Sequence, residues 1–178
     1  IETVGVGQSE VEVRSITDAF LLLMLPNAGD EIQGIKRGIM ELADMMFINK
    51  ADGQLLPLAE IAKGHVRSAL SLMHSPTQGW DVPVITGSGL EQHGIQELLK
   101  MCDTFFDDSA PHHQALIERR AQQAKEWFEI ALHRELILWA ENQNSWNVDK
   151  QAYLDDIHQK NIVPSIAARK LIENLFNK

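Results

Sequence analysis

Cysteine is nearly absent from this chain, because Cys102 is the only one among its 178 residues. A single cysteine excludes an internal disulfide and is typical of a reducing compartment, so we expect a cytoplasmic protein with Cys102 on the core face of a helix. Long apolar runs are also missing, since none approaches the roughly 18 residues of a membrane-spanning helix. The start has no signal-peptide pattern. We therefore expect no membrane span.

Positive charge is scarce as well, and the formal net charge is −9. Residues 1–108 contain 16 Asp and Glu but only 7 Lys and Arg, whereas residues 109–178 contain 9 of each group. Binding to a nucleic-acid backbone requires a basic surface, so this balance argues against nucleic acid as a partner. The hydrophobic content of 44% is sufficient for a packed core.

Residues 1–108 alternate apolar segments with helical patterns. The run 19–25 is continuously apolar and is followed by Pro26, which predicts a central parallel strand covered on both faces. Further strands are expected at 45–48 and 82–86, and helices at 35–42, 58–73 and 94–106. This alternation predicts a parallel α/β sheet with right-handed crossovers.

Residues 109–178 lack strand patterns and predict helices only. We expect a long helix over 114–140 and shorter helices at 149–159 and 165–176, the last with Ser165 as its N-cap. The sequence therefore predicts two domains, an α/β domain at 1–108 and an all-helical extension at 109–178.

The most informative motif is Asn49-Lys50-Ala51-Asp52, directly after the apolar segment 45–48. The carboxylate of Asp52 can accept two hydrogen bonds from the N1–H and the N2 amino group of guanine. Adenine lacks these donors and would leave the carboxylate unpaired, which supports discrimination of about 10⁴-fold. We expect Asn49 to bridge the loop to neighbouring backbone and the Lys50 stem to lie along the base. Alone, the motif is also typical of an ordinary polar turn.

Two other loops are expected at strand ends of the same sheet. In the first, Glu2-Thr3-Val4-Gly5, Glu2 can hold Mg²⁺ through water and the N–H of Gly5 can reach the γ-phosphate of a nucleotide. Gln8 and Glu10 then become candidates for orienting an attacking water. A glycine-rich turn without a ligand is the alternative interpretation.

The second loop, Ser88-Gly89-Leu90, follows the expected strand 82–86. Its backbone N–H groups can bind guanine O6, although many strand-to-helix loops contain Gly and Ser. Ligands of open α/β sheets bind outside the carboxyl ends of the strands, so the order of the three loops predicts one nucleotide site.

Several other polar segments carry weaker signals. The loop 26–36 is either an acidic helix start or a mobile loop that reports nucleotide state. His112 and His113 are adjacent in a polar linker and are more typical of solvated side chains than of metal ligands. The four tryptophans favour packing and interfaces over a cofactor site.

Three segments together resemble the ArgK/MeaB family of P-loop GTPases, the bacterial relatives of the human methylmalonic aciduria type A protein. They are Glu2–Glu10 (ETVGVGQSE), Pro26–Asp44 (PNAGDEIQGIKRGIMELAD) and Asn49–Gly53 (NKADG). The resemblance implies the C-terminal half of a P-loop GTPase core followed by helices that form a homodimer. It also implies hydrolysis of GTP to GDP and a chaperone role for adenosylcobalamin-dependent methylmalonyl-CoA mutase.

The resemblance also assigns roles to individual residues. Glu2 belongs to the Mg²⁺ and switch segment, and Asn49, Lys50 and Asp52 belong to guanine recognition. A switch loop that signals to the mutase is matched by Asp30, Glu31, Gln33 and Lys36. The helices of residues 109–178 match the dimerisation arm of the family.

The sequence departs from the family pattern in three ways. Asn27 and Gly89 replace the Gly and Ala that the family commonly has, and no GxxxxGK(S/T) stretch occurs in these residues. That stretch cradles the phosphates, so we expect this piece alone to bind GTP poorly and to hydrolyse none. Because the sequence begins at Ile1 without an initiator Met, we expect that an upstream half exists.

Other functions remain open at this point. An older label in the family is a lysine/arginine/ornithine (LAO/AO) transport-system ATPase or kinase, which nucleotide preference would distinguish. A nickel-delivering GTPase would require clustered Cys and His ligands, which one Cys and scattered His do not provide. A non-catalytic interaction module, with the α/β part as a scaffold, is the last alternative.

Overall fold

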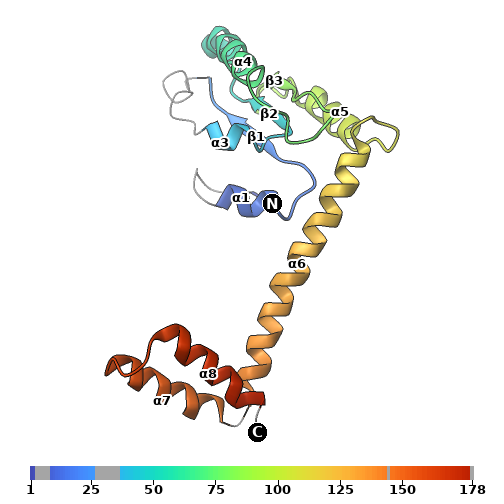
Figure 1. The fold of residues 1–178 in the computed structure, drawn as a ribbon. Coiled ribbons are helices and arrows are strands. Elements are labelled where there is room, and N and C mark those ends of the chain that lie inside the picture. Colours follow the sequence, from blue (N-terminus) through green and yellow to red (C-terminus); the bar gives the residue numbers. More distant parts are fainter. Residues whose placement is uncertain (3–8, 27–36, 144, 177–178) are drawn as a thin grey trace. The chain divides into compact units, whose positions relative to one another are not determined.

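The computed structural model describes residues 1–2, 9–26, 37–143 and 145–176 (Figure 1). They form two compact units, residues 1–123 and 124–178. The long helix α6 (His113–Glu141) begins in the first unit and continues into the second.

The first unit contains a three-stranded parallel sheet with the order β1-β2-β3. Its strands are β1 (Leu21–Met24), β2 (Met45–Ile48) and β3 (Val84–Thr86). Every residue of β2 is buried, and β2 pairs with a strand on each side. This arrangement confirms the predicted parallel α/β fold.

The prediction that residues 19–25 form a central strand is wrong for the part of the chain that the structure describes. β1 is an edge strand there, and Leu21 and Leu23 are 36% and 61% exposed. A continuous apolar run indicates that a segment favours burial, but it does not determine the order of strands in a sheet.

Helices cover the sheet as the alternating pattern predicts. The first unit contains α1 (Ser9–Arg14), α3 (Arg37–Met40), the 3₁₀ turn η1 (Gly53–Leu55), α4 (Leu56–Leu70) and α5 (Ile95–Phe105). Pro57 stands in the first turn of α4, where its missing N–H costs nothing. Gly94, with φ of +76°, precedes α5.

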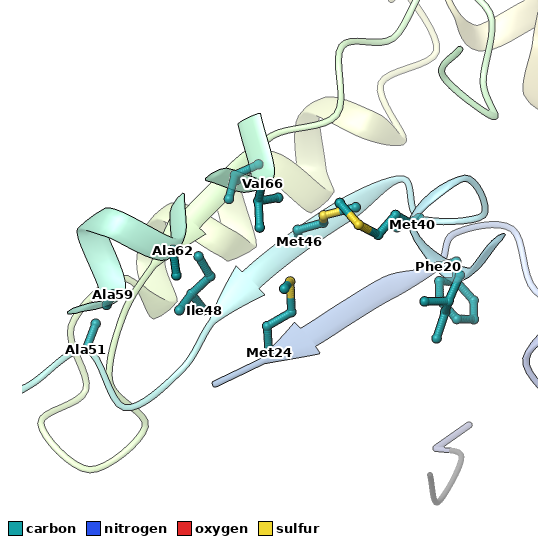
Figure 2. Packing of buried hydrophobic residues seen from close by; sticks show 12 residues of the cluster. Phe20, Met24, Met40, Met46, Ile48, Ala51, Ala59, Ala62 and Val66 are labelled. Atoms are coloured by element: carbon teal, nitrogen blue, oxygen red, sulfur yellow. The ribbon is translucent and has the colours of Figure 1, made fainter. Parts of the chain in front are cut away.

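The two faces of β2 belong to two hydrophobic clusters because neighbouring side chains of a strand point in opposite directions. Met46 and Ile48 pack with residues of β1, α3 and α4 (Figure 2). The labelled members from those elements and their flanks are Phe20, Met24, Met40, Ala51, Ala59, Ala62 and Val66. On the other face, Met45 packs with Trp80, Phe105 and Leu116.

His112 is part of this second core and is not the solvated residue that its polar surroundings indicate. It is 2% exposed, and its ring lies against those of Trp80 and Phe105, at centroid distances of 4.6 and 5.4 Å. Its Nε2 lies 2.9 Å from the carbonyl oxygen of Phe105. Cys102 lies on α5 against the same cluster, as predicted.

The second unit consists of the C-terminal part of α6 with α7 (Trp146–His158) and α8 (Pro164–Phe176). Trp139 stacks on Phe176 at 5.9 Å, and Asn174 donates a hydrogen bond to the Tyr153 hydroxyl at 3.2 Å. Helix α8 starts one residue earlier than predicted, so Ser165 lies inside it and does not cap it. Among the described residues, no helix has the length and apolarity to cross a bilayer.

Candidate nucleotide-binding site

The loop Asn49–Gly53 leaves β2 at its carboxyl end and is tied to the loop that follows β3. The N–H of Gly87 donates to Ile48 O at 3.0 Å, and the N–H of Ala51 donates to Gly87 O at 2.9 Å. Ala51 is fully buried, whereas Lys50 is exposed with a left-handed φ of 60°. The two loops that the sequence places at neighbouring strand ends therefore lie side by side.

Asn49 makes the bridge that its residue type predicts. Its Oδ1 accepts hydrogen bonds from the N–H of Lys50 at 2.8 Å and the N–H of Gly89 at 3.0 Å. The first bond holds the left-handed backbone of Lys50, and the second joins residues that are 40 positions apart.

Asp52 lies beside the second loop and is half-buried. Its Oδ2 accepts a hydrogen bond from the hydroxyl of Ser88, which is itself fully buried. The N–H of Glu91 donates to the same hydroxyl oxygen at 3.1 Å, which fixes its direction. Oδ1 of Asp52 accepts no hydrogen bond from any residue that the structure describes, so it remains available to a ligand.

The loop after β3 uses two of its three candidate backbone donors internally. The N–H of Ser88 donates to His93 O at 3.0 Å, and the N–H of Gly89 donates to Asn49. The N–H of Leu90 has no partner within the described ranges, and the Leu90 side chain is 87% exposed. Leu90 is therefore the open donor of this loop. The N–H of Gly89 could donate to a ligand only after giving up its bond to Asn49.

Two glycines that the sequence analysis did not single out set the path of this loop. A Cβ on Gly87 would lie 2.5 Å from Cζ of Phe47 and 2.6 Å from His93 O. A Cβ on Gly94 would lie 2.6 Å from Thr86 O. Gly87 and Gly94 flank the segment Ser88–His93. Two glycines in these positions are the sequence signal for a closed loop whose ends pass close to other backbone atoms.

The described part of the structure does not bring together the residues that were predicted to bind the phosphates and the metal ion. Glu2 is exposed in an irregular segment. The predicted residues Gly5, Gln8, Asp30, Glu31, Gln33 and Lys36 lie outside the described residues. No group of three or more His, Cys, Asp and Glu that could hold a metal occurs in the described part of the chain.

A parallel α/β sheet with an NKxD loop packed against a Ser-Gly-Leu loop at its carboxyl edge defines a domain of the P-loop GTPase class. The family model described as methylmalonyl Co-A mutase-associated GTPase MeaB matches residues 1–144. The chain belongs to this MeaB family of GTPases.

Individual relatives agree with this assignment. GTPase ArgK of Escherichia coli is 38% identical over 137 residues, which are 77% of this chain and 41% of that protein. The mitochondrial methylmalonic aciduria type A homolog of Caenorhabditis elegans is 33% identical over 181 residues, which are 99% of this chain and 44% of that protein. The chain thus spans less than half the length of these relatives.

A solved structure described as a LAO/AO transport system kinase is also similar. Its TM-score is 0.63 at 31% identity, and the match covers 97% of this chain and 55% of that one. This match extends the shared fold beyond residue 144, where the family model ends.

Proposed function

We propose that the loops after β2 and β3 bind the guanine base of GTP or GDP. The observation that supports this most strongly is the state of Asp52, whose Oδ2 is oriented by Ser88 while Oδ1 has no partner among the described residues. The parallel donors N1–H and N2–H of guanine match a carboxylate edge. Oδ2 keeps a second lone pair after accepting from Ser88, so both oxygens can accept from the base.

Competition between nucleotides tests this proposal in the intact protein that carries these residues. GDP and ADP are titrated against a bound fluorescent GDP analogue. Because adenine offers Asp52 no matching pair of donors, GDP should displace the analogue at a concentration lower than that of ADP by about 10³-fold or more. Equal displacement by both nucleotides would contradict guanine recognition.

We further propose that the intact protein hydrolyses GTP to GDP and phosphate with Mg²⁺. The GTPase names of the relatives support this reaction class. Glu2 is exposed and can offer its carboxylate, and Mg²⁺ commonly takes only one or two carboxylates together with waters and phosphates. Gly5 and Gln8 keep their predicted roles at the γ-phosphate and the attacking water. Glu2→Gln should raise the Mg²⁺ concentration required for half-maximal phosphate release.

The physiological role that we propose is that of a chaperone for adenosylcobalamin-dependent methylmalonyl-CoA mutase. The family description and the methylmalonic aciduria type A homologs support it. In this proposal Asp30, Glu31, Gln33 and Lys36 signal nucleotide state to the mutase. Capture of the purified mutase should differ between GDP and a non-hydrolysable GTP analogue, and no capture in either state would contradict the role.

We also propose that the second unit forms a homodimer. Its part of α6 exposes many large apolar side chains, including Trp127, Ile130 and Ile137 at 53%, 65% and 57%. Apolar surface of this extent is typical of an interface. Ile130→Lys with Ile137→Lys should convert a dimer into a monomer in sedimentation, whereas Val163→Lys outside α6 should not.

A second candidate is an ATPase or kinase associated with LAO/AO transport. The name of the similar solved structure favours it. Preference for ATP in the competition experiment would support this candidate and contradict the first.

A further inference from the structure

Asp44 lies directly before β2 and is a fully buried carboxylate that binds distant parts of the first unit. Its Oδ2 accepts hydrogen bonds from Arg14 Nη1 at 2.6 Å and from the N–H of Phe20 at 2.9 Å. Its Oδ1 accepts from Thr77 Oγ1 at 2.6 Å and from Arg14 Nη2 at 3.0 Å. Arg14, the last residue of α1, is thus bound by a two-point ion pair.

A second guanidinium, that of Arg119, lies beside the same carboxylate. Arg119 of α6 has its Nη2 at 3.5 Å from Asp44 Oδ1, and its side chain is 14% exposed. Other bonds hold it there, because Nη1 donates to Asp18 O at 2.7 Å and Nη2 donates to Pro76 O at 3.2 Å. Nη2 also donates to Thr77 Oγ1, whose own hydroxyl donates to Asp44. Burial, and to a lesser degree the charge of Arg14, lower the pKa of Arg119, while Asp44 opposes this change. One carboxylate therefore faces two cations.

The turn after α1 is attached to α6 without the Arg14 guanidinium. Gln123 Nε2 donates to the main-chain oxygens of Arg14 at 3.1 Å and Thr17 at 3.0 Å. Arg120 Nε donates to Asp18 Oδ1 at 2.6 Å. These contacts do not depend on the pair between Arg14 and Asp44, so they can persist when that pair opens.

We propose that Arg14, Arg119 and Asp44 form a releasable latch for α1. When the Arg14 guanidinium leaves Asp44, Arg119 closes from 3.5 Å to ordinary hydrogen-bond distance and keeps the buried carboxylate paired. Without this replacement, removal of Arg14 would leave a buried charge unpaired, at a cost of about 100-fold or more in the unfolding constant.

The latch has a consequence for the GTPase cycle that rests on the proposed function. Helix α1 directly follows residues 2–8, which include the candidate phosphate-side residues Glu2, Gly5 and Gln8. Release of Arg14 therefore frees α1 beside these candidate residues, while Thr17 and Asp18 stay bonded to Gln123 and Arg120. Because the latch itself needs no nucleotide, it can be tested independently of guanine binding.

The test is a double-mutant cycle in the full chain with Arg14→Gln, Arg119→Gln and both together. Urea denaturation gives the unfolding constant, and hydrogen exchange follows the amides of Ser15 and Ile16, which donate to Glu12 O and Val13 O in the last turn of α1. Arg14→Gln should speed exchange of these amides by about 10-fold or more while changing the unfolding constant by less than about 10-fold.

The double variant should change the unfolding constant by at least about 10-fold more than the product of the single changes. This excess should vanish in an Asp44→Asn background, where no buried charge needs a partner. Arg134→Gln, an exposed arginine on α6, serves as the control. If the variant that carries both Arg14→Gln and Arg119→Gln does not fold, the same double-mutant cycle is measured with Arg14→Lys and Arg119→Lys.

Two results would overturn the latch. Additive changes in the cycle would mean that Arg119 does not replace Arg14. Unchanged exchange of Ser15 and Ile16 in Arg14→Gln would mean that the pair does not hold α1.

Discussion

The side-chain oxygen of Asn49 accepts a hydrogen bond from the N–H of Gly89 at 3.0 Å, which joins the loop after β2 to the loop after β3. The same oxygen binds the N–H of Lys50 at 2.8 Å. Asn49 therefore organises both halves of the proposed base site.

Replacement of Asn49 by Ala should loosen both loops. Loss of two hydrogen bonds costs about 1–3 kcal/mol, and Lys50, at a φ of 60°, loses the bond that holds its strained backbone. Urea denaturation should report this loss, and affinity for GDP should fall by at least about 10-fold. Asn49→Asp keeps the accepting oxygen and should retain more of the stability, so equal losses in the two variants would contradict this role.

The N–H of Leu90 should be the first loop donor to meet guanine O6, because those of Ser88 and Gly89 are already bonded. Amide resonances in ¹H–¹⁵N spectra provide the measurement. On addition of GDP, the Leu90 proton should shift downfield more than that of Ser88. A large Ser88 shift with an unchanged Leu90 would show that the loop opens differently.

Gly87→Ala should destabilise the chain by about 2 kcal/mol or more, since the added carbon would lie 2.5 Å from Phe47 Cζ and 2.6 Å from a backbone oxygen. Gly64→Ala is the matched control within α4, where nothing lies within 4 Å. That change should stabilise by about 0.5–1 kcal/mol through helix propensity. Thermal unfolding of both variants tests the pair, and a Gly87→Ala variant as stable as the parent would contradict the loop geometry.

Cys102 should react slowly with alkylating reagents near neutral pH. Burial, and after it the neighbouring charge of Asp103, raise the pKa of the Cys102 thiol. A raised pKa means less thiolate at a given pH, so alkylation should be slower in the folded chain than in urea, and the difference should shrink as pH rises. Asp103→Asn should accelerate the folded-state reaction modestly. Equal rates in the folded and unfolded chains would be inconsistent with this environment.

The base side of the site is predictable from the sequence because it depends on a general property of parallel sheets. Asn49–Asp52 and Ser88–Leu90 each follow a strand, and the carboxyl ends of neighbouring parallel strands meet at one edge. The structure brings them together through Asn49 and Asp52. Which N–H groups remain open is not predictable, because it depends on the closed path of the loop between Gly87 and Gly94.

The long-range polar contacts and the order of the strands could not be predicted from the sequence either. Asp44 falls in the sequence between the expected helix 35–42 and the expected strand 45–48, yet it pairs with Arg14 and Arg119, which are 30 and 75 positions away. His112 reads as a linker residue but is buried against the rings of Trp80 and Phe105. Charge and apolarity are local properties, whereas these positions result from how separate elements pack.

The central claim, recognition of guanine by Asp52, is tested most directly by exchanging the nucleobase together with the side chain. Xanthine carries a carbonyl where guanine carries the N2 amino group, and an amide can donate to that carbonyl while accepting from N1–H. Asp52→Asn should therefore lose GDP affinity by about 100-fold and gain affinity for xanthosine diphosphate, while Asp103→Asn should change neither. Isothermal titration of both nucleotides to the intact protein is the measurement. Unchanged GDP affinity in Asp52→Asn, or a loss of GDP binding without any gain for the xanthine nucleotide in a folded variant, would contradict the account.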